Sequence, residues 1–304
     1  MRYGMMLDVS APLPDVVRQV RGIADGGFDL ALCTQVTGYY DAPTVLALAG
    51  YQVPGIELVT GVVPAKPHHP IALATQALTV SAATDGRFTL GLGLSHKFVV
   101  EGVFGLSYDR PASYMREYVE VLVSLMNREQ VKYEGDHFQV ATRVPLDVVA
   151  SAPPVLMAAL GSRMLGVAGA VADGTVTWMT GPATVADHIV PTVTAAAAAA
   201  GRPAPRVHVI LPICVTADRD TTYAEATSAF GIYDMMPSYR AMLDREGAGT
   251  PADVAIIGDE EAVLRGIRRV EDAGATELTV VPFGSAADRR RTFELVAAQT
   301  RAPA

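Results

Sequence analysis

The stretch GRFTLGLGLSHKF, residues 86–98, decides how the rest of the sequence is interpreted. Its apolar residues continue without alternation from Phe88 to Leu94, which is typical of a parallel strand covered on both faces. A glycine-rich phosphate loop is the alternative, but GLGLS lacks the GxGxxG spacing of a dinucleotide fingerprint. The stretch therefore predicts a buried strand that delivers Ser95, His96 and Lys97 to its carboxyl end.

Seven further segments show the same continuous hydrophobicity and alternate with segments of helical spacing. The eight predicted strands are Arg2–Leu7, Phe28–Cys33, Ile56–Val63, Phe88–Leu94, Val155–Leu160, Thr175–Met179, Val207–Val215 and Glu277–Phe283. Eight strands that are each followed by a crossover favour a (βα)8 TIM barrel, in the α/β class, over an open doubly wound sheet. No linker rich in Pro, Gly or Ser divides the chain, so residues 1–304 are predicted to form a single domain.

Two segments depart from a plain barrel. Asn127–Val140 has the pattern of a short strand, a turn and a second strand, which predicts a hairpin insertion before strand five. The section Asp218–Gly258 has helical spacing and predicts a helical insertion before the last helix of the barrel, which is expected at Glu260–Asp272.

Composition excludes several classes of partner. The chain of 304 residues is 50% hydrophobic and 18% charged with a net charge of −8, so no basic field exists to attract nucleic acid. The amino terminus does not resemble a signal peptide, and no apolar run is long enough to span a membrane. We therefore expect a cytoplasmic protein in which Cys33 and Cys214 are buried, reduced thiols.

In such a barrel the residues that follow each strand form the mouth, where ligands bind. The predicted site residues, all expected at this mouth, are Asp8, Thr34, Gln35, Gly61, Val62, Val63, Ser95, His96, Gly161, Ser162 and Arg163. No HxH, HExxH or carboxylate cluster indicates a catalytic metal, and no GxSxG elbow indicates a covalent nucleophile. Few and mostly apolar side chains at the mouth suit a bound cofactor that carries the chemistry.

Two of these positions have both a functional and a structural interpretation. The ordinary pKa of a histidine, near 6.5, suits His96 for proton transfer, but the side chain could instead donate to a loop carbonyl. In GSRMLGVAG, Gly161 and Ser162 precede a helix whose free amides and nearby Arg163 could bind an anion, or Ser162 could be an ordinary helix cap.

Long collinear stretches of the chain resemble the bacterial luciferase-like flavin and deazaflavin oxidoreductases. They are residues 57–95 (ELVTGVVPAKPHHPIALATQALTVSAATDGRFTLGLGLS), 108–140, 159–179 (ALGSRMLGVAGAVADGTVTWM) and 257–284. SHKFVVEGVFGLSYDRP, residues 95–111, is similar to the branch that uses coenzyme F420, an 8-hydroxy-5-deazaflavin. The resemblance implies a barrel with an extra insertion, a redox ring at its mouth and a homodimer.

The resemblance also assigns roles to individual positions. It implies that the ring lies against a bulge with a non-proline cis peptide at Gly61–Val62, and that Gly161 and Ser162 contact the phosphate of the cofactor tail. Relatives that oxidise sugar phosphates carry an acidic residue and a catalytic histidine near Thr34 and Gln35, and a catalytic glutamate at the position of His96. Their substrate and proton-transfer scheme therefore do not transfer to this chain.

Three hypotheses follow. The first is an F420-dependent oxidoreductase that moves a hydride between the deazaflavin C5 and a small organic substrate, with His96 as proton donor or ring-holding group. The second is a monooxygenase that uses FMN. F420 differs from FMN in the length and charge of its tail, which carries a lactyl and oligoglutamate extension, and the candidates to contact this extension are Lys66, Lys97, Arg163 and Arg202. The third is a non-catalytic cofactor-binding protein whose pocket is blocked by the bulky residues of the mouth, which are Tyr39, Tyr40, Phe98, Phe104, Tyr108 and Trp178.

Overall fold

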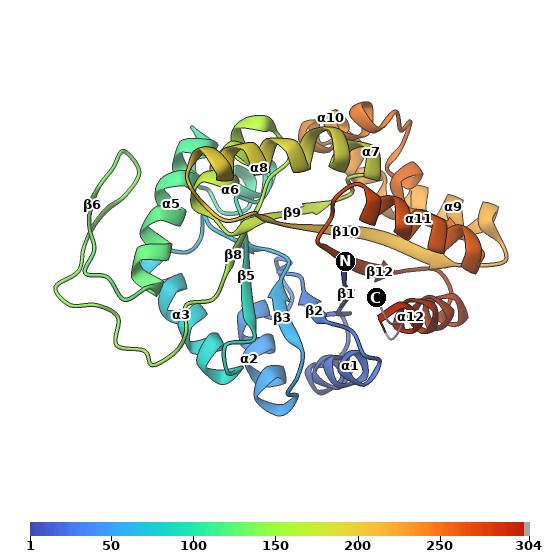
Figure 1. Cartoon of the computed structure of the whole chain (residues 1–304), viewed down its shortest axis with the longest axis horizontal. Coiled ribbons are helices and arrows are strands. Elements are labelled where there is room, and N and C mark those ends of the chain that lie inside the picture. Colours follow the sequence, from blue (N-terminus) through green and yellow to red (C-terminus); the bar gives the residue numbers. More distant parts are fainter. Residues whose placement is uncertain (301–304) are drawn as a thin grey trace.

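The computed structural model describes residues 1–300 and shows a closed barrel of eight parallel strands with helices around it (Figure 1). The barrel strands are β1 (Arg2–Met6), β2 (Leu30–Cys33), β3 (Glu57–Thr60), β5 (Phe88–Gly93), β8 (Val155–Ala158), β9 (Gly174–Trp178), β10 (Arg206–Val215) and β12 (Glu277–Pro282). Neighbouring strands pair in this order, and the pairings of β10 with β9 and of β12 with β1 close the ring. The predicted (βα)8 barrel is confirmed.

An outer layer of helices covers the barrel. Its members are α1 (Leu13–Asp25), α2 (Ala42–Gln52), α3 (Pro70–Ala83), α5 (Pro111–Met126), α6 (Ser162–Val171), α8 (Val190–Ala199), α11 (Glu260–Asp272) and α12 (Ala286–Thr300). Local sequence explains where such helices begin: in α11 the Asp259 side chain accepts from the Ala262 N–H, and Val263, Ile267 and Val270 form the buried stripe. Shorter pieces are α4 (Lys97–Gly102), α7 (Pro182–Thr184) and the π turn η1 (Val185–Ile189). Among residues 1–300, none of the helices combines the length and the apolar character that a membrane crossing needs.

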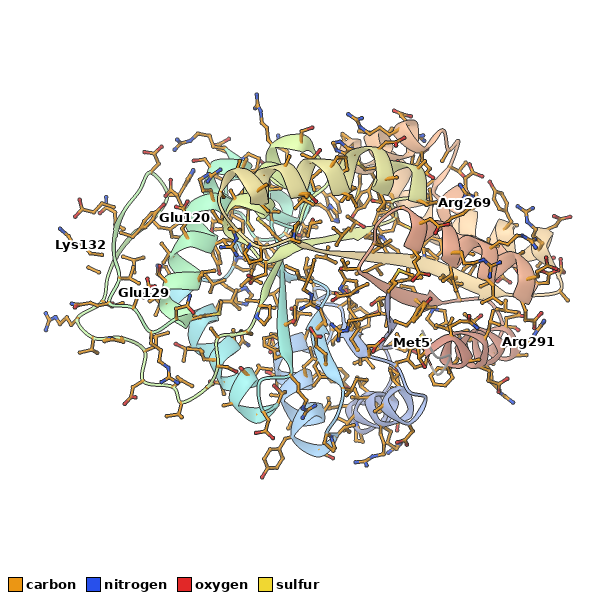
Figure 2. The ribbon with its side chains drawn as sticks, in the orientation of Figure 1. Met5, Glu120, Glu129, Lys132, Arg269 and Arg291 are labelled. Atoms are coloured by element: carbon orange, nitrogen blue, oxygen red, sulfur yellow. The ribbon has the colours of Figure 1, made fainter. Side chains whose placement is uncertain are left out.

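The predicted hairpin is present as β6 (Lys132–Glu134) and β7 (Gln139–Ala141), paired antiparallel before β8. It projects from the barrel beside α5 (Figure 1), and the charged side chains of Glu129 and Lys132 point away from the barrel (Figure 2). The hairpin turn is held by Glu117 of α5, whose carboxylate accepts N–H groups from residues 136–138 at 2.8–3.2 Å.

The helical insertion follows β10. It consists of α9 (Arg219–Phe230), the 3-10 turn η2 (Gly231–Met235), α10 (Pro237–Glu246), the 3-10 turn η3 (Pro251–Val254) and the short edge strand β11 (Ile256–Gly258). The insertion precedes α11 as predicted, but α11 is not the last helix of the barrel, because α12 follows β12. The segment of α12 was not recognised because only Thr292, Val296 and Ala297 of its residues are buried, which leaves a weak apolar pattern.

A polar cluster closes the amino-terminal end of the barrel. The Arg206 guanidinium donates to Glu277 at 2.7 Å, to Glu57 at 2.8 Å and to the Thr89 hydroxyl at 3.0 Å. Arg2 pairs with the same two carboxylates, at 2.6 Å and 3.1 Å. Burial raises the pKa of Glu277, whereas at Glu57 burial is outweighed by Arg206, Thr89 and Arg2, which hold the pKa of that carboxyl below its usual range. Each charge in this cluster therefore depends on its partners.

We expect Arg206→Met to lower the free energy of unfolding by about 2–4 kcal/mol, because two largely buried carboxylates lose a shared partner. Arg265→Met is the matched control: within the described residues Arg265 pairs only with the exposed Glu261 one turn away, so its loss should cost less than about 0.5 kcal/mol. Urea unfolding followed by circular dichroism measures both, and equal midpoints for the two variants would contradict the assigned role.

Candidate functional site

The mouth of the barrel has an apolar floor. The interior of the barrel holds a cluster of fully buried apolar residues, against which five partly exposed side chains pack: Met6, Val62, Ala158, Trp178 and Val281. Four of these come from the carboxyl halves of β1, β8, β9 and β12, and Val62 follows β3. They form a surface without charge at the position where ligands bind in barrels of this kind.

The bulge after β3 sets the shape of this floor. The Gly61–Val62 peptide is cis, as the resemblance implied. The Thr60 hydroxyl accepts from the Gly91 N–H at 2.8 Å and lies 2.9 Å from the Gly91 carbonyl, to which it donates. A Cβ on Gly91 would overlap the Thr60 carbonyl, and one on Gly93 would lie 2.7 Å from the Val62 side chain. Gly91 and Gly93 of the opening stretch are therefore required by close contacts with the bulge.

The structure places the other predicted residues at the same end of the barrel, with different surroundings. Val63 begins the two-residue strand β4 (Val63–Pro64), and its side chain lies in the core beneath the helices, so only its backbone belongs to the bulge. The Gln35 side chain accepts from the Ala42 N–H at 2.6 Å and so holds the start of α2. That these residues contact a cofactor stays a prediction.

His96 follows β5 and is half-buried among aromatic rings. Its imidazole is stacked on Phe98 with centroids 5.8 Å apart and planes 2° apart, and it lies 5.8 Å from the Tyr239 ring. No hydrogen bond to its ring nitrogens occurs within residues 1–300, so the structural alternative of a bond to a loop carbonyl is not observed. Burial lowers the pKa of His96. At neutral pH the imidazole is uncharged and has a nitrogen free to accept a proton.

Four aromatic side chains, which we call the aromatic wall, lie beside the floor: Trp178, Phe230, Tyr233 and Tyr239. Trp178 contacts Phe230 at 5.9 Å and Tyr233 at 5.8 Å, and Tyr233 lies 4.9 Å from Tyr239. Of these residues only Trp178 was recognised from the sequence, because the other three belong to the helical insertion. Their spacing in a helical segment gives no sign that they face the mouth, and tertiary packing alone brings them there.

The amino terminus of α6 is exposed at the mouth. Gly161 occupies the N-cap position and neither it nor Ser162 caps the helix through a side chain, so the ordinary-cap interpretation of Ser162 is wrong. Helix geometry leaves the first N–H groups without intrahelical acceptors, and Ser162 and Arg163 are exposed there. This arrangement can receive a phosphate or carboxylate.

The cationic side chains suggested for an anionic tail separate into two groups. Lys66 follows β4 at the mouth and lies 3.6 Å from the centroid of the Tyr114 ring; burial lowers its pKa, an effect that Asp109 opposes. The prediction that Arg202 contacts the tail is wrong. Arg202 precedes β10, pairs with Asp173 at 3.0 Å and lies at the amino-terminal end of the barrel, opposite the mouth. It cannot contact a tail bound at the amino terminus of α6.

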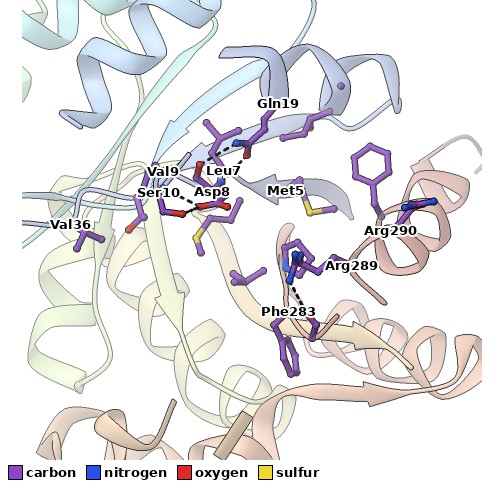
Figure 3. Close-up of a pocket in the computed structure, with 18 of the residues that line it drawn as sticks. Met5, Leu7, Asp8, Val9, Ser10, Gln19, Val36, Phe283, Arg289 and Arg290 are labelled. Carbon is purple, nitrogen blue, oxygen red and sulfur yellow. Dashed lines mark hydrogen bonds between the residues drawn. The ribbon is translucent and has the colours of Figure 1, made fainter. Parts of the chain in front are cut away.

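A cavity of about 890 Å³ opens beside the floor (Figure 3). Asp8 and Thr34 line it, together with residues of α1, α12 and the segment after β12. Within residues 1–300, no group of three or more His, Cys, Asp or Glu side chains is arranged to hold a metal ion.

Comparisons with known proteins agree with this geometry. The family model for luciferase-like monooxygenases matches residues 1–277. The 5,10-methylenetetrahydromethanopterin reductase of Methanopyrus kandleri is 26% identical over 333 aligned positions, which cover 93% of this chain and 94% of the reductase. Two solved structures share the fold: the coenzyme F420-dependent tetrahydromethanopterin reductase of Methanopyrus kandleri (TM-score 0.82, 24% identity, 97% of each chain) and an FMN-bound 3,6-diketocamphane monooxygenase component of Pseudomonas putida (TM-score 0.77, 16% identity, 99% of this chain and 97% of the other).

We expect Gly91→Ala to lower the free energy of unfolding by at least about 2 kcal/mol, because the added methyl group must displace the backbone at Thr60. The control is Gly102→Ala at the end of α4, where a new Cβ meets no atom within 4 Å and the effect should stay within about 1 kcal/mol. Urea unfolding of both variants measures the difference, and a Gly91→Ala protein as stable as the control would refute the close contact.

Proposed function

The chain belongs to the luciferase-like monooxygenase family of oxidoreductases, and we propose that it uses coenzyme F420 to exchange a hydride with a small organic substrate. The observation that carries the proposal is the uncharged floor at the mouth, bounded on one side by the exposed amino terminus of α6. Relatives that share the family include F420-dependent enzymes, which supports the choice of cofactor.

The residues present fit such a group. A flat tricyclic ring suits the floor, where Val62 and Trp178 are partly exposed and no side chain carries a charge. A phosphate suits the N–H groups at Ser162 and Arg163, because a helix amino terminus favours negative charge. Once bound, the deazaflavin supplies the carbon that donates or accepts a hydride.

The contribution of the protein is orientation and proton transfer. His96 offers a ring nitrogen that has no protein partner within the described residues, and its lowered pKa keeps it neutral at pH 7. A neutral imidazole suits the acceptance of a proton from a substrate hydroxyl. The Tyr239 ring lies beside this imidazole, and Tyr233 packs against Tyr239. A small-molecule substrate and a homodimer stay predictions.

A monooxygenase that uses FMN is the second candidate, because an FMN-bound monooxygenase component shares the fold. The two cofactors differ in their tails, since F420 carries a lactyl and oligoglutamate extension. Lys66, Lys97 and Arg163 lie at the mouth and favour the longer anionic tail. Cofactor affinity therefore separates the two candidates.

We expect the purified protein to bind F420 at least about tenfold more tightly than FMN, and Ser162→Asp to weaken F420 binding about tenfold or more by placing a carboxylate at the helix amino terminus. Ser162→Ala is the control, because the Ser162 hydroxyl caps nothing and its loss should change affinity less than about threefold. Fluorescence titration measures both. Failure to bind F420 below tens of micromolar, or tighter binding of FMN, would overturn the choice of cofactor.

We expect His96→Gln to leave F420 affinity unchanged and to lower kcat for oxidation of a hydroxyl substrate by about 100-fold or more. Because the pKa of His96 lies below 6.5, the wild-type rate should fall only as the pH drops below that value, and the variant should lose this acidic limb. Steady-state rates between pH 4.5 and 8 on a panel of small alcohols test this, and an unchanged pH profile would show that His96 transfers no proton.

A further inference from the structure

We propose that the cavity between α1 and α12 binds the substrate, and that this substrate is an amphipathic anion with an apolar body. The proposal rests on the function proposed above, because it names the substrate class of the same site. The cavity measures about 890 Å³, within the range of pockets that hold small molecules. Figure 3 shows β1, α1 and α12 arranged around it.

The position of the cavity suits a substrate. In the closed ring, β1 and β8 are four places apart among eight strands and so lie on opposite sides of the mouth. The cavity adjoins β1 and β12, whereas the exposed amino terminus of α6 follows β8. Met6 and Val281 belong both to the floor and to the lining of the cavity. A ligand in the cavity therefore reaches the floor from the side that a cofactor anchored at α6 leaves open.

The inner lining of the cavity is apolar. Met5 and Leu7 of the β1 segment and Ile23 of α1 are buried there, and the rings of Phe283 and Phe293 contribute from the other side. Phe283 and Phe293 are partly exposed, so an aliphatic or aromatic ligand that covers their rings removes apolar surface from water.

Two arginines of α12 give the cavity a positive rim. Arg289 donates to the Gly284 carbonyl at 2.6 Å, and Arg290 has neither an ion pair nor a hydrogen bond within residues 1–300. Among residues 1–300, Asp8 is the one carboxylate in the lining, and its side chain accepts from the Ser10 hydroxyl at 2.5 Å and from the Ser10 N–H at 3.0 Å. Two cations against one carboxylate leave the lining positive, although the chain carries a net charge of −8.

The backbone of Asp8 is hydrogen-bonded within the protein. The Asp8 N–H donates to the Gln19 side chain at 2.8 Å, and the Gln19 amide donates back to the Asp8 carbonyl at 3.1 Å. The Asp8 backbone therefore needs no partner from a ligand. The Arg290 guanidinium has no partner among residues 1–300, and a carboxylate or sulfonate on the ligand can pair with it.

A matched pair of fluorescent probes tests the charge requirement. 8-Anilinonaphthalene-1-sulfonate carries an apolar aromatic body and one anionic group, and N-phenyl-1-naphthylamine has the same body without the charge. We expect the sulfonate to bind to the wild-type protein with one-to-one stoichiometry and about tenfold more tightly than the neutral probe at low ionic strength.

Variants locate the site. The double variant Arg289→Gln/Arg290→Gln should weaken sulfonate binding about tenfold and leave binding of the neutral probe within about twofold. Arg268→Gln is the control: Arg268 is an exposed arginine of α11 outside the cavity, and its loss should change neither probe. Circular dichroism confirms that each variant is folded.

Equal affinity for the two probes, or a double variant that binds the sulfonate as the wild type does, would overturn the proposal. An F420 titration of the same proteins separates this failure from failure of the proposed function. If F420 binds but the probes do not behave as expected, only the assignment of the cavity is wrong. If F420 does not bind, the proposed function is wrong, and the cavity is then not the substrate site of an F420-dependent enzyme.

Discussion

The contact between the backbone at Thr60 and strand β5 at Gly91 is the constraint on which the mouth of this barrel depends. The Thr60 hydroxyl both donates to and accepts from the backbone of Gly91, so the two strands are fixed at one point. With no side chain at Gly91, the bulge that follows Thr60 can lie directly against β5 and turn Val62 into the floor. The direction in which β5 delivers His96 is set by the same contact, because β5 ends three residues before it.

The two ends of the barrel have opposite chemistry. At the base, Arg206 and Arg2 pair with Glu57 and Glu277, and buried His208, whose pKa burial lowers to about 3, forms a hydrogen bond with the Thr279 hydroxyl at 2.7 Å. The cluster of interior side chains nearer the mouth carries no charge. The mouth can therefore present an uncharged surface at the centre of a protein with an acidic exterior.

The sequence predicts most of what the backbone determines and little of what tertiary packing determines. Continuous apolar runs identify the eight strands because parallel strands covered on both faces have no polar side. The direction of the strands then places Gly61 and Ser162 at the carboxyl end of the barrel. The same rule should have placed Arg202 at the amino-terminal end, since Arg202 precedes β10. The aromatic residues Phe230 and Tyr239 could not be placed, because nothing local determines where an insertion folds back. The cavity beside α12 was missed for a related reason: the amphipathic pattern of that helix is too weak to reveal it.

The elements around the mouth divide into two sets with different freedom to change. The floor and the proposed anion site depend on backbone: the bulge at Gly61, the contact at Gly91 and the first amides of α6. The wall and the cavity depend on side chains carried by the insertion after β10 and by α12. A substitution at Arg290 leaves every strand pairing in place, whereas one at Gly91 moves the floor itself. Such a barrel can keep one redox cofactor in a fixed position while side chains on the other side of the mouth select the molecule that reacts with it.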